Sequence, residues 1–249
     1  MNKLFPGLII VLISVFVGVV FFSCNTEKKI KVLVVTGGHD YDKEGFEELL
    51  AKLPGSYDQV EHPNALAMLN SEKFASYDVV LFYDMPLKSE SNTAVCFYEL
   101  TDAGKGIIVL HHAFCSYNAW PEYERMIGGS YYRYPWKKDG VAQDASTYTH
   151  DVTFDVKVED PNHPVTEGVS DFQITDETYG NVDIMPNVYP LLSTTEPSSA
   201  LLVGWTNIYR NSRVVTLTLG HDRSAWENPS FIQILSQAVK WTAENDKTH

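Results

Sequence analysis

Three short apolar runs of the chain share one pattern, in which nearly every position is apolar. These runs are residues 30–36, 77–83 and 107–110. A strand buried on both faces, as in a parallel sheet, gives such a continuous run, whereas a half-exposed strand alternates. Segments with helical periodicity separate the runs. These segments are residues 42–53, 65–74 and 92–103, and a short strand is expected at residues 59–61. This alternation predicts an α/β fold with a doubly wound, mostly parallel sheet of the flavodoxin-like type.

The second half of the chain has a different pattern. Residues 153–159 alternate between apolar and polar, which predicts a half-exposed strand. Residues 199–206 and 213–219 are expected to be the closing strands, and residues 230–244 the C-terminal helix. The polar, aromatic stretch that ends at His150 shows neither the helical period nor the alternation of a half-exposed strand. We expect a long loop or lid there, because structureless runs of this length are uncommon unless they are functional.

The first residues differ from the rest, because a basic residue precedes a long, nearly uncharged run that leads to Cys24. This form is typical of a secretory signal. The position of Cys24 resembles the lipobox of bacterial lipoproteins, whose cysteine is acylated after cleavage. We therefore expect a signal peptide over residues 1–23, a tether over 24–29 and one folded domain over 30–245. An uncleaved anchor helix is the alternative, since roughly 20 apolar residues can span a bilayer. Either form attaches the domain to a membrane of the cell envelope, on the periplasmic side or at the cell surface.

The amino-acid composition says more about which partners the protein can bind than about which reaction it catalyses. The 249 residues carry a formal net charge of −13, and no cluster of basic residues is present that would bind a phosphate backbone. Nucleic acid is therefore not expected as a partner. Beyond the leader the chain has two cysteines, Cys96 and Cys115. Outside the cytoplasm they could pair, but buried free thiols are the simpler interpretation.

Three of the eight histidines directly follow predicted strands, and they are His39, His112 and His221. Asp84 follows another strand in the same way. In open α/β sheets, ligands bind in the crevice outside the carboxyl ends of the strands. The pattern therefore places these imidazoles at one candidate site, where they can transfer protons or bind a metal.

Several short motifs, taken in order along the chain, resemble the trehalose-utilisation ThuA-like family. They are Gly37-Gly38-His39, His111-His112, Gly128-Gly129, Asn162-His163-Pro164-Val165, Asp176-Glu177-Thr178-Tyr179 and Leu219-Gly220-His221 with Trp226, Asn228-Pro229, Phe231 and Lys240-Trp241. The resemblance covers residues 31–243. It implies a class I glutamine amidotransferase-like fold and a role in the breakdown of trehalose and other glycosides. It also implies a partner enzyme, a sugar oxidoreductase that makes 3-keto sugars.

Three kinds of chemistry fit these residues. A cysteine hydrolase is disfavoured, because Cys115 comes too late after its strand and lacks flanking glycines. A divalent metal, zinc or manganese, could be held by His39, His112 and His221, with Glu177 or Asp84 completing the shell. Without a metal, one histidine would take a proton from a sugar and Glu177 or another histidine would return it, in hydrolysis, elimination or isomerisation. We therefore predict four catalytic residues: His39, His112, Glu177 and His221.

Other side chains are candidates for contacts with a small sugar or glycoside. They are His111, Asp84, Tyr132, Tyr179, Trp120 and Trp226. For each aromatic residue the alternative is ordinary core packing, and His111 could point into the core, because successive residues leaving a strand face opposite ways. The function predicted is that of an enzyme acting on glycosides or 3-keto sugars. The alternative is a lipoprotein that binds sugars without catalysis and passes them to a partner enzyme.

Overall fold

The parallel half of the sheet agrees with the prediction. The computed structural model describes residues 29–62, 64–86, 88, 93–117 and 120–244. Its main sheet has nine strands in the order β2-β1-β3-β4-β13-β12-β11-β8-β9. The first five are parallel to one another. They are β1 (Lys31–Gly37), β2 (Ser56–Glu61), β3 (Val79–Asp84), β4 (Gly106–Leu110) and β13 (Ser212–Leu217).

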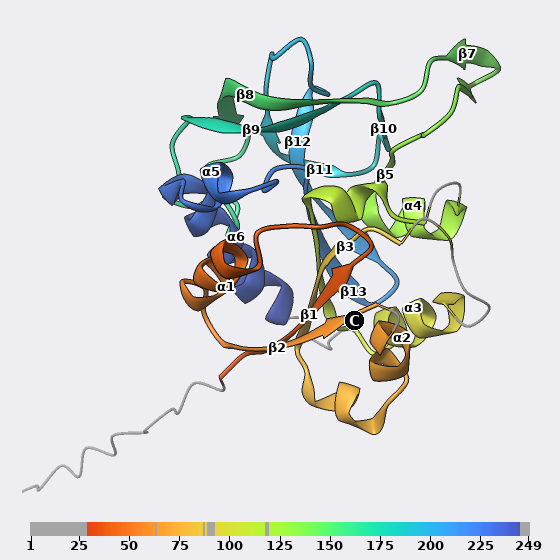
Figure 1. The fold of residues 1–249 in the computed structure, drawn as a ribbon, viewed down its shortest axis with the longest axis vertical. Helices are drawn as coiled ribbons and strands as arrows, with labels where there is room; N and C mark the ends of the chain where they lie inside the picture. The colour runs from red at the N-terminus through yellow and green to blue at the C-terminus, as the bar shows by residue number, and fades with distance from the viewer. Residues whose placement is uncertain (1–28, 63, 87, 89–92, 118–119, 245–249) are drawn as a thin grey trace, which may run out of the picture.

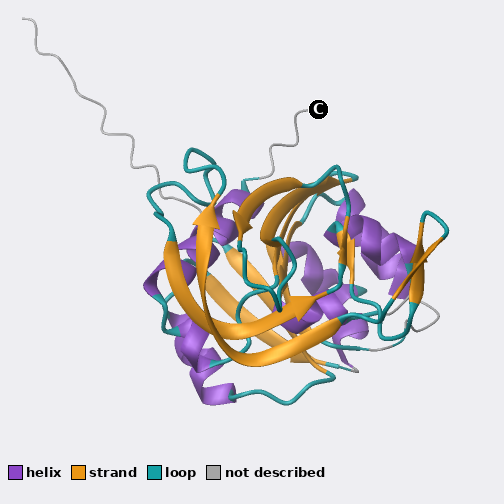
Figure 2. Cartoon of the chain, turned by 90° about the horizontal axis from the view of Figure 1, so that it is seen from above, coloured by secondary structure: helices purple, strands orange, loops and turns teal. Residues whose placement is uncertain are grey.

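Helices cover both faces of these strands, as Figures 1 and 2 show. One face packs on α1 (Lys43–Ala51), α5 (Arg223–Trp226) and α6 (Pro229–Ala243). The other packs on α2 (Asn64–Leu69), α3 (Thr93–Asp102) and α4 (Pro121–Ile127). Two 3-10 helices complete this half, η1 (Glu72–Ser76) and η2 (His111–Cys115). Alternate residues of β1 enter the two cores, Val32 on the α1 side and Leu33 on the α2 side. The doubly wound, flavodoxin-like sheet is therefore confirmed, and two-sided burial explains the continuous apolar runs.

The other half of the sheet is antiparallel and was only partly predicted. It consists of β12 (Leu202–Tyr209), β11 (Tyr189–Ser193), β8 (Thr147–Val158) and β9 (Phe172–Gly180). The long strands β8 and β9 form a ribbon at the edge of the sheet, above the carboxyl ends of the parallel strands in Figure 1. The expected half-exposed strand and the two closing strands are present, with shifted ends.

The predicted long loop or lid before His150 is wrong in large part. That segment contains β5 (Gly129–Ser130), the hairpin of β6 (Trp136–Lys138) and β7 (Val141–Gln143), and the first residues of β8. The hairpin projects from the body, and β5 pairs with β10 (Asp183–Ile184). These strands are short or exposed, so their sequences lack the apolar alternation that marks a half-buried strand.

The predicted leader over residues 1–23 and Cys24 lie outside the described residues. Within the described ranges, no helix is both long and apolar enough to cross a membrane. Cys96 and Cys115 are both buried and both free, so the pairing considered for them is not found.

Candidate functional site

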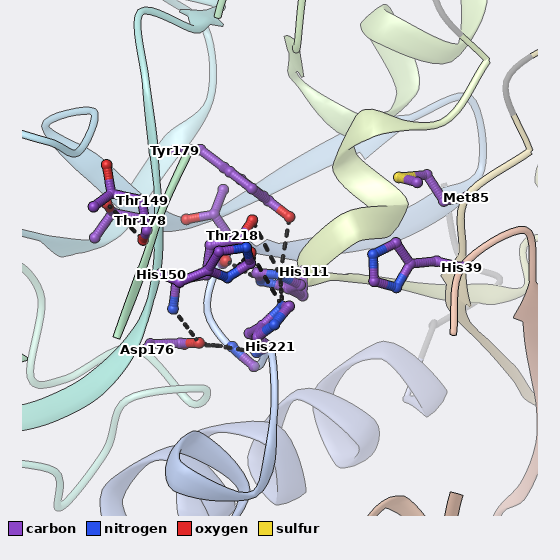
Figure 3. A network of polar contacts seen from close by, with 12 residues as sticks. His39, Met85, His111, Thr149, His150, Asp176, Thr178, Tyr179, Thr218 and His221 are labelled. Carbon is purple, nitrogen blue, oxygen red and sulfur yellow. Dashed lines mark hydrogen bonds and ion pairs between the residues drawn. The ribbon is translucent and has the colours of Figure 1, made fainter. Parts of the chain in front are cut away.

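Three strands of the parallel half end at one cleft. β1 leads through Gly38 to His39, β4 leads directly into His111 and His112, and the turn after β13 carries His221. All four histidines line a cleft of about 220 Å³. Figure 3 shows His111 and His221 close together, with His39 on the opposite side. The structure thus brings together the histidines that the sequence placed at strand ends, and it adds His111, which we suspected of facing the core.

The β8–β9 ribbon forms the facing wall of the cleft. It contributes Tyr148 and His150 from β8, and Glu177 and Tyr179 from β9. His150, placed in a loop by the sequence, is therefore a strand residue that reaches the site. Glu177 and Tyr179 are both buried, and they arrive at the cleft with the predicted histidines.

His111 is oriented by hydrogen bonds on both ring nitrogens. It is fully buried, and its Nδ1 lies 2.8 Å from the carbonyl oxygen of Thr218. Since a carbonyl only accepts, Nδ1 carries the proton and Nε2 presents its lone pair to the cleft. There Nε2 lies 2.9 Å from Tyr179 Oη and 3.0 Å from His221 Nδ1. Burial holds the pKa of His111 well below its usual value, so the ring is neutral at neutral pH.

Glu177 lies at the centre of the site. One carboxylate oxygen is 2.7 Å from His150 Nδ1 and 3.3 Å from His221 Nδ1. The other oxygen is 3.9 Å from His111 Nε2. A single buried carboxylate thus faces three imidazoles, which is an arrangement that can hold a cation or relay a proton.

The residues whose ligand atoms converge differ from the predicted metal set. In His111, Glu177 and His221 these atoms all lie within 4.8 Å of one another. His111 thus takes the place that we expected for His39 and His112, whereas His221 and Glu177 both belonged to the predicted set. Two imidazoles and one carboxylate are a donor set that suits zinc with an open fourth position. The Thr218 carbonyl on the far nitrogen of His111 is the kind of contact that orients metal-binding histidines.

His112 is turned away from this cluster. Its Nε2 lies 3.3 Å from the carbonyl oxygen of Tyr83, and its ring stacks on His39 at 4.8 Å between centroids. Burial, followed by the neighbouring His39, lowers the pKa of His112 to about 3. Its Nδ1 is buried without a hydrogen-bond partner among the described residues. His112 is therefore a neutral ring with one free acceptor nitrogen, whereas His39 is exposed beside it.

Asp176 holds the His221 turn against the ribbon. Its carboxylate accepts hydrogen bonds from the backbone N–H groups of Gly220 at 2.6 Å, His221 at 2.9 Å and Glu177 at 2.8 Å. Burial raises the pKa of Asp176 to about 7, although these three donors oppose the shift. The two carboxylates of the motif Asp176-Glu177 therefore have different roles. Asp176 positions the backbone, and Glu177 faces the cleft.

Four predicted contact residues lie outside the cleft lining. Trp226 is core, with its Nε1 donating to the Gly220 carbonyl at 2.9 Å. Trp120 packs against Phe97 on the α3 side. Tyr132 stacks on Trp136 at 4.2 Å.

Asp84 is the fourth of these residues. It is fully buried and bonds His62 Nε2 at 2.8 Å. Sequence alone could not show the direction of these side chains, because aromatic and acidic residues serve both cores and sites.

Some lining residues were not predicted as site residues. Besides His150, they are Met85, Cys115, Tyr131, Arg133 and Tyr148. Burial raises the pKa of Cys115 to about 12, so its thiol stays protonated, which does not suit a nucleophile. Tyr131 lines the cleft where we expected its neighbour Tyr132. The Tyr131–Tyr132 pair in the sequence was a signal for an aromatic wall, but not for which ring faces inward.

The turn that delivers His39 depends on glycine at position 38. Gly38 has φ +81, and a Cβ there would lie 2.5 Å from the carbonyl oxygen of Met85. Gly140 has a similar φ of +85, but open space around it. We expect Gly38→Ala to lower the free energy of unfolding by about 1–3 kcal/mol more than Gly140→Ala, because only the first adds an overpacked contact. Urea denaturation of both variants tests this, and equal losses would contradict it.

Comparisons with known proteins agree with the fold and the motifs. The family model described as ThuA, trehalose utilisation, matches residues 31–242. The chain belongs to the ThuA family. A ThuA-like protein from Parabacteroides merdae has a TM-score of 0.70 at 21% identity, over 89% of this chain and 92% of that one. One from Bacteroides uniformis has a TM-score of 0.64 at 17% identity, over 88% and 93%.

The wider fold of this ThuA family member is that of glutamine amidotransferase-like proteins. PurLQS from Thermotoga maritima has a TM-score of 0.55 at 12% identity, over 86% of this chain and 99% of that one. At this identity the similarity shows the fold alone. A search of curated protein sequences finds no match.

Proposed function

We propose that this ThuA family protein acts on a glycoside or a 3-keto sugar by histidine-based chemistry assisted by a divalent metal, zinc or manganese. The observation that carries the proposal is the convergence of His111 Nε2, His221 Nδ1 and the Glu177 carboxylate in one cleft. The family description, trehalose utilisation, supports a carbohydrate substrate. The cleft of about 220 Å³ is smaller than the roughly 300–1,000 Å³ of pockets for drug-sized ligands, which suits a single sugar ring.

The donor set fits a metal, which would polarise a sugar carbonyl or activate water when bound. His111 offers a lone pair held in place by the Thr218 carbonyl. Glu177 contributes the negative charge, and His221 is held by the hydrogen bond from its own backbone N–H to Asp176. These residues are therefore the ligands we propose, and His39 and His112 are not among them.

The remaining histidines serve the proton transfers. A carbonyl at C3 acidifies the neighbouring C–H bond, so a positioned base can promote elimination or isomerisation, and the same residues can assist hydrolysis. His39 and His150 are exposed at the cleft and can exchange protons with water. The Nδ1 of His112 is an acceptor without a partner among the described residues, and a sugar hydroxyl would reach this buried atom only if the ring turned toward the cleft. A sugar oxidoreductase acting earlier would supply the 3-keto group.

We propose that Cys24 carries a lipid anchor and that the domain acts in the cell envelope. The competing function is a lipoprotein that binds sugars without turnover. A sugar-binding protein needs acceptors, donors and aromatic walls, but it does not need three titratable groups around one carboxylate. One result distinguishes the two functions. An enzyme and a sugar-binding lipoprotein would both bind the sugar, but only the enzyme would form a product that NMR detects.

The test is a thermal unfolding survey with zinc or manganese, and with plain or 3-keto glycosides. Metal at about a hundred times its dissociation constant should stabilise the protein by roughly 2.7 kcal/mol. We expect His111→Ala and His221→Ala to abolish the metal response and His39→Ala to keep it. A response lost in His39→Ala and His112→Ala but kept in His111→Ala would restore the first ligand set. No response to any metal or sugar would reject the proposed function.

A further inference from the structure

Arg133 lies in the cleft, where no described acidic side chain pairs with it. It lines the same cavity as the five histidines and Glu177, and its side chain is partly buried. Its Nη2 lies 3.4 Å from the Met85 sulfur, and its Nε is buried without a hydrogen-bond partner among the described residues. No side chain in the described part of the chain forms an ion pair with Arg133.

Such a position is costly for a guanidinium. Arginine is always charged and offers five N–H donors, and a thioether is a weak acceptor. A partly desolvated cation needs a charged or strongly accepting partner. The four other arginines have one, since Arg125 pairs with Glu122, Arg210 with Asp102 and Arg223 with Asp42, and Arg213 donates to the Trp241 carbonyl. Arg133 differs from these four because no charged or strongly accepting group of the described residues contacts it.

We propose that Arg133 binds a carboxylate group of the substrate, so that the cleft selects an acidic sugar of the uronic type. This inference rests on the proposed function and names its substrate class. The planar guanidinium fork matches a carboxylate with two parallel hydrogen bonds.

The surroundings favour a singly charged carboxylate over a phosphate. Among the described residues that line the cleft, Arg133 is the one lysine or arginine, whereas Glu177 adds a negative charge to the same cavity. The carboxylate of Glu177 would repel a phosphate dianion, and the single guanidinium of Arg133 would have to offset both negative charges of the phosphate. A sugar carboxylate needs only the fork, while its hydroxyl groups can reach the imidazoles and Tyr131.

The test compares methyl glucuronide with methyl glucoside, which differ in a carboxylate, by calorimetric titration of the purified protein. We expect the glucuronide to bind roughly 10- to 150-fold more tightly, the range for hydrogen bonds to a charged group. Arg133→Gln should remove this preference without weakening the glucoside. Arg133→Lys, which keeps the charge but loses the fork, should retain part of it. Arg125→Gln removes the same charge outside the cleft and should change neither affinity.

The outcomes distinguish a failure of the role given to Arg133 from a failure of the proposed function. Equal binding of the two sugars by the wild-type protein would overturn the role of Arg133 and leave the proposed function standing. Tighter binding of glucose 6-phosphate than of the glucuronide would overturn the carboxylate assignment. Binding of neither sugar, in a protein that melts cooperatively, would reject the acidic-sugar inference together with the sugar-based function. The wild-type comparison needs no variant, so a poorly folded Arg133 variant would not obscure it.

Discussion

Replacing Glu177 by glutamine is expected to lower turnover of the sugar substrate by roughly 100- to 10,000-fold, the usual contribution of a positioned acid or base. The substitution keeps the size of the side chain and removes its charge. It thereby removes the negative charge that lies 2.7 Å from His150 and 3.3 Å from His221. It also takes the one anion from the proposed metal ligands. The measurement is product formation by NMR, with bound metal determined separately.

Glu159→Gln is the matched control for this variant. Glu159 makes its contacts with Lys157 and Ser193, outside the cleft lining, so the same chemical change there should leave turnover and bound metal unaltered. Full turnover by Glu177→Gln would place the proton transfers on His39 and His150 alone. Loss of metal with normal turnover would separate the two roles given to Glu177 and reject metal assistance.

Replacing Trp226 by alanine is expected to lower the free energy of unfolding by about 3–5 kcal/mol, as for large aromatic residues in cores. Its ring is 1% exposed and lies 5.4 Å from the ring of Phe46 and 6.0 Å from that of Tyr83. Its Nε1 also satisfies the Gly220 carbonyl, next to His221. For a domain of this size the melting temperature should fall by about 6–20 °C.

Trp226→Phe separates the two contributions of this residue. It keeps most of the packing and leaves the Gly220 carbonyl without its donor, so it should cost about 1–3 kcal/mol. Both variants are measured by urea and thermal denaturation. If Trp226 were instead a sugar platform, as the sequence suggested, both variants would keep their stability and lose only sugar affinity.

The parallel half of the fold was predictable because a strand that is buried on both faces has a continuous apolar sequence. The apolar run at residues 107–110 lies within β4, and the double histidine follows it where the strand ends. The rule that ligands gather at the carboxyl edge then placed His39, His112 and His221 correctly in one cleft. The antiparallel ribbon of β8 and β9 has no continuous apolar run of this kind, because much of β8 is exposed and polar.

The details of the site depend on directions that sequence does not encode. Whether His111 or His112 faces Glu177 is decided by the turn of η2, where His111 has φ 50 and its ring bonds the Thr218 carbonyl. The choice of Tyr131 over Tyr132 is decided similarly by local backbone. Arg133 was overlooked because a lone arginine in a polar stretch is ordinarily a surface residue. Only the structure shows that no acidic side chain of the described residues pairs with it.

The contacts that complete the cleft join residues far apart in the chain. Asp176 bonds residues 44 and 45 positions away, and Tyr179 bonds His111 across 68 positions. Pairings of this kind form only after large loops have closed, so they belong to the late part of folding. A partly folded chain therefore contains every histidine of the site but cannot assemble the cleft. Ligand recognition is thus reserved for molecules that have finished folding, and an immobilised ligand would separate them from misfolded ones.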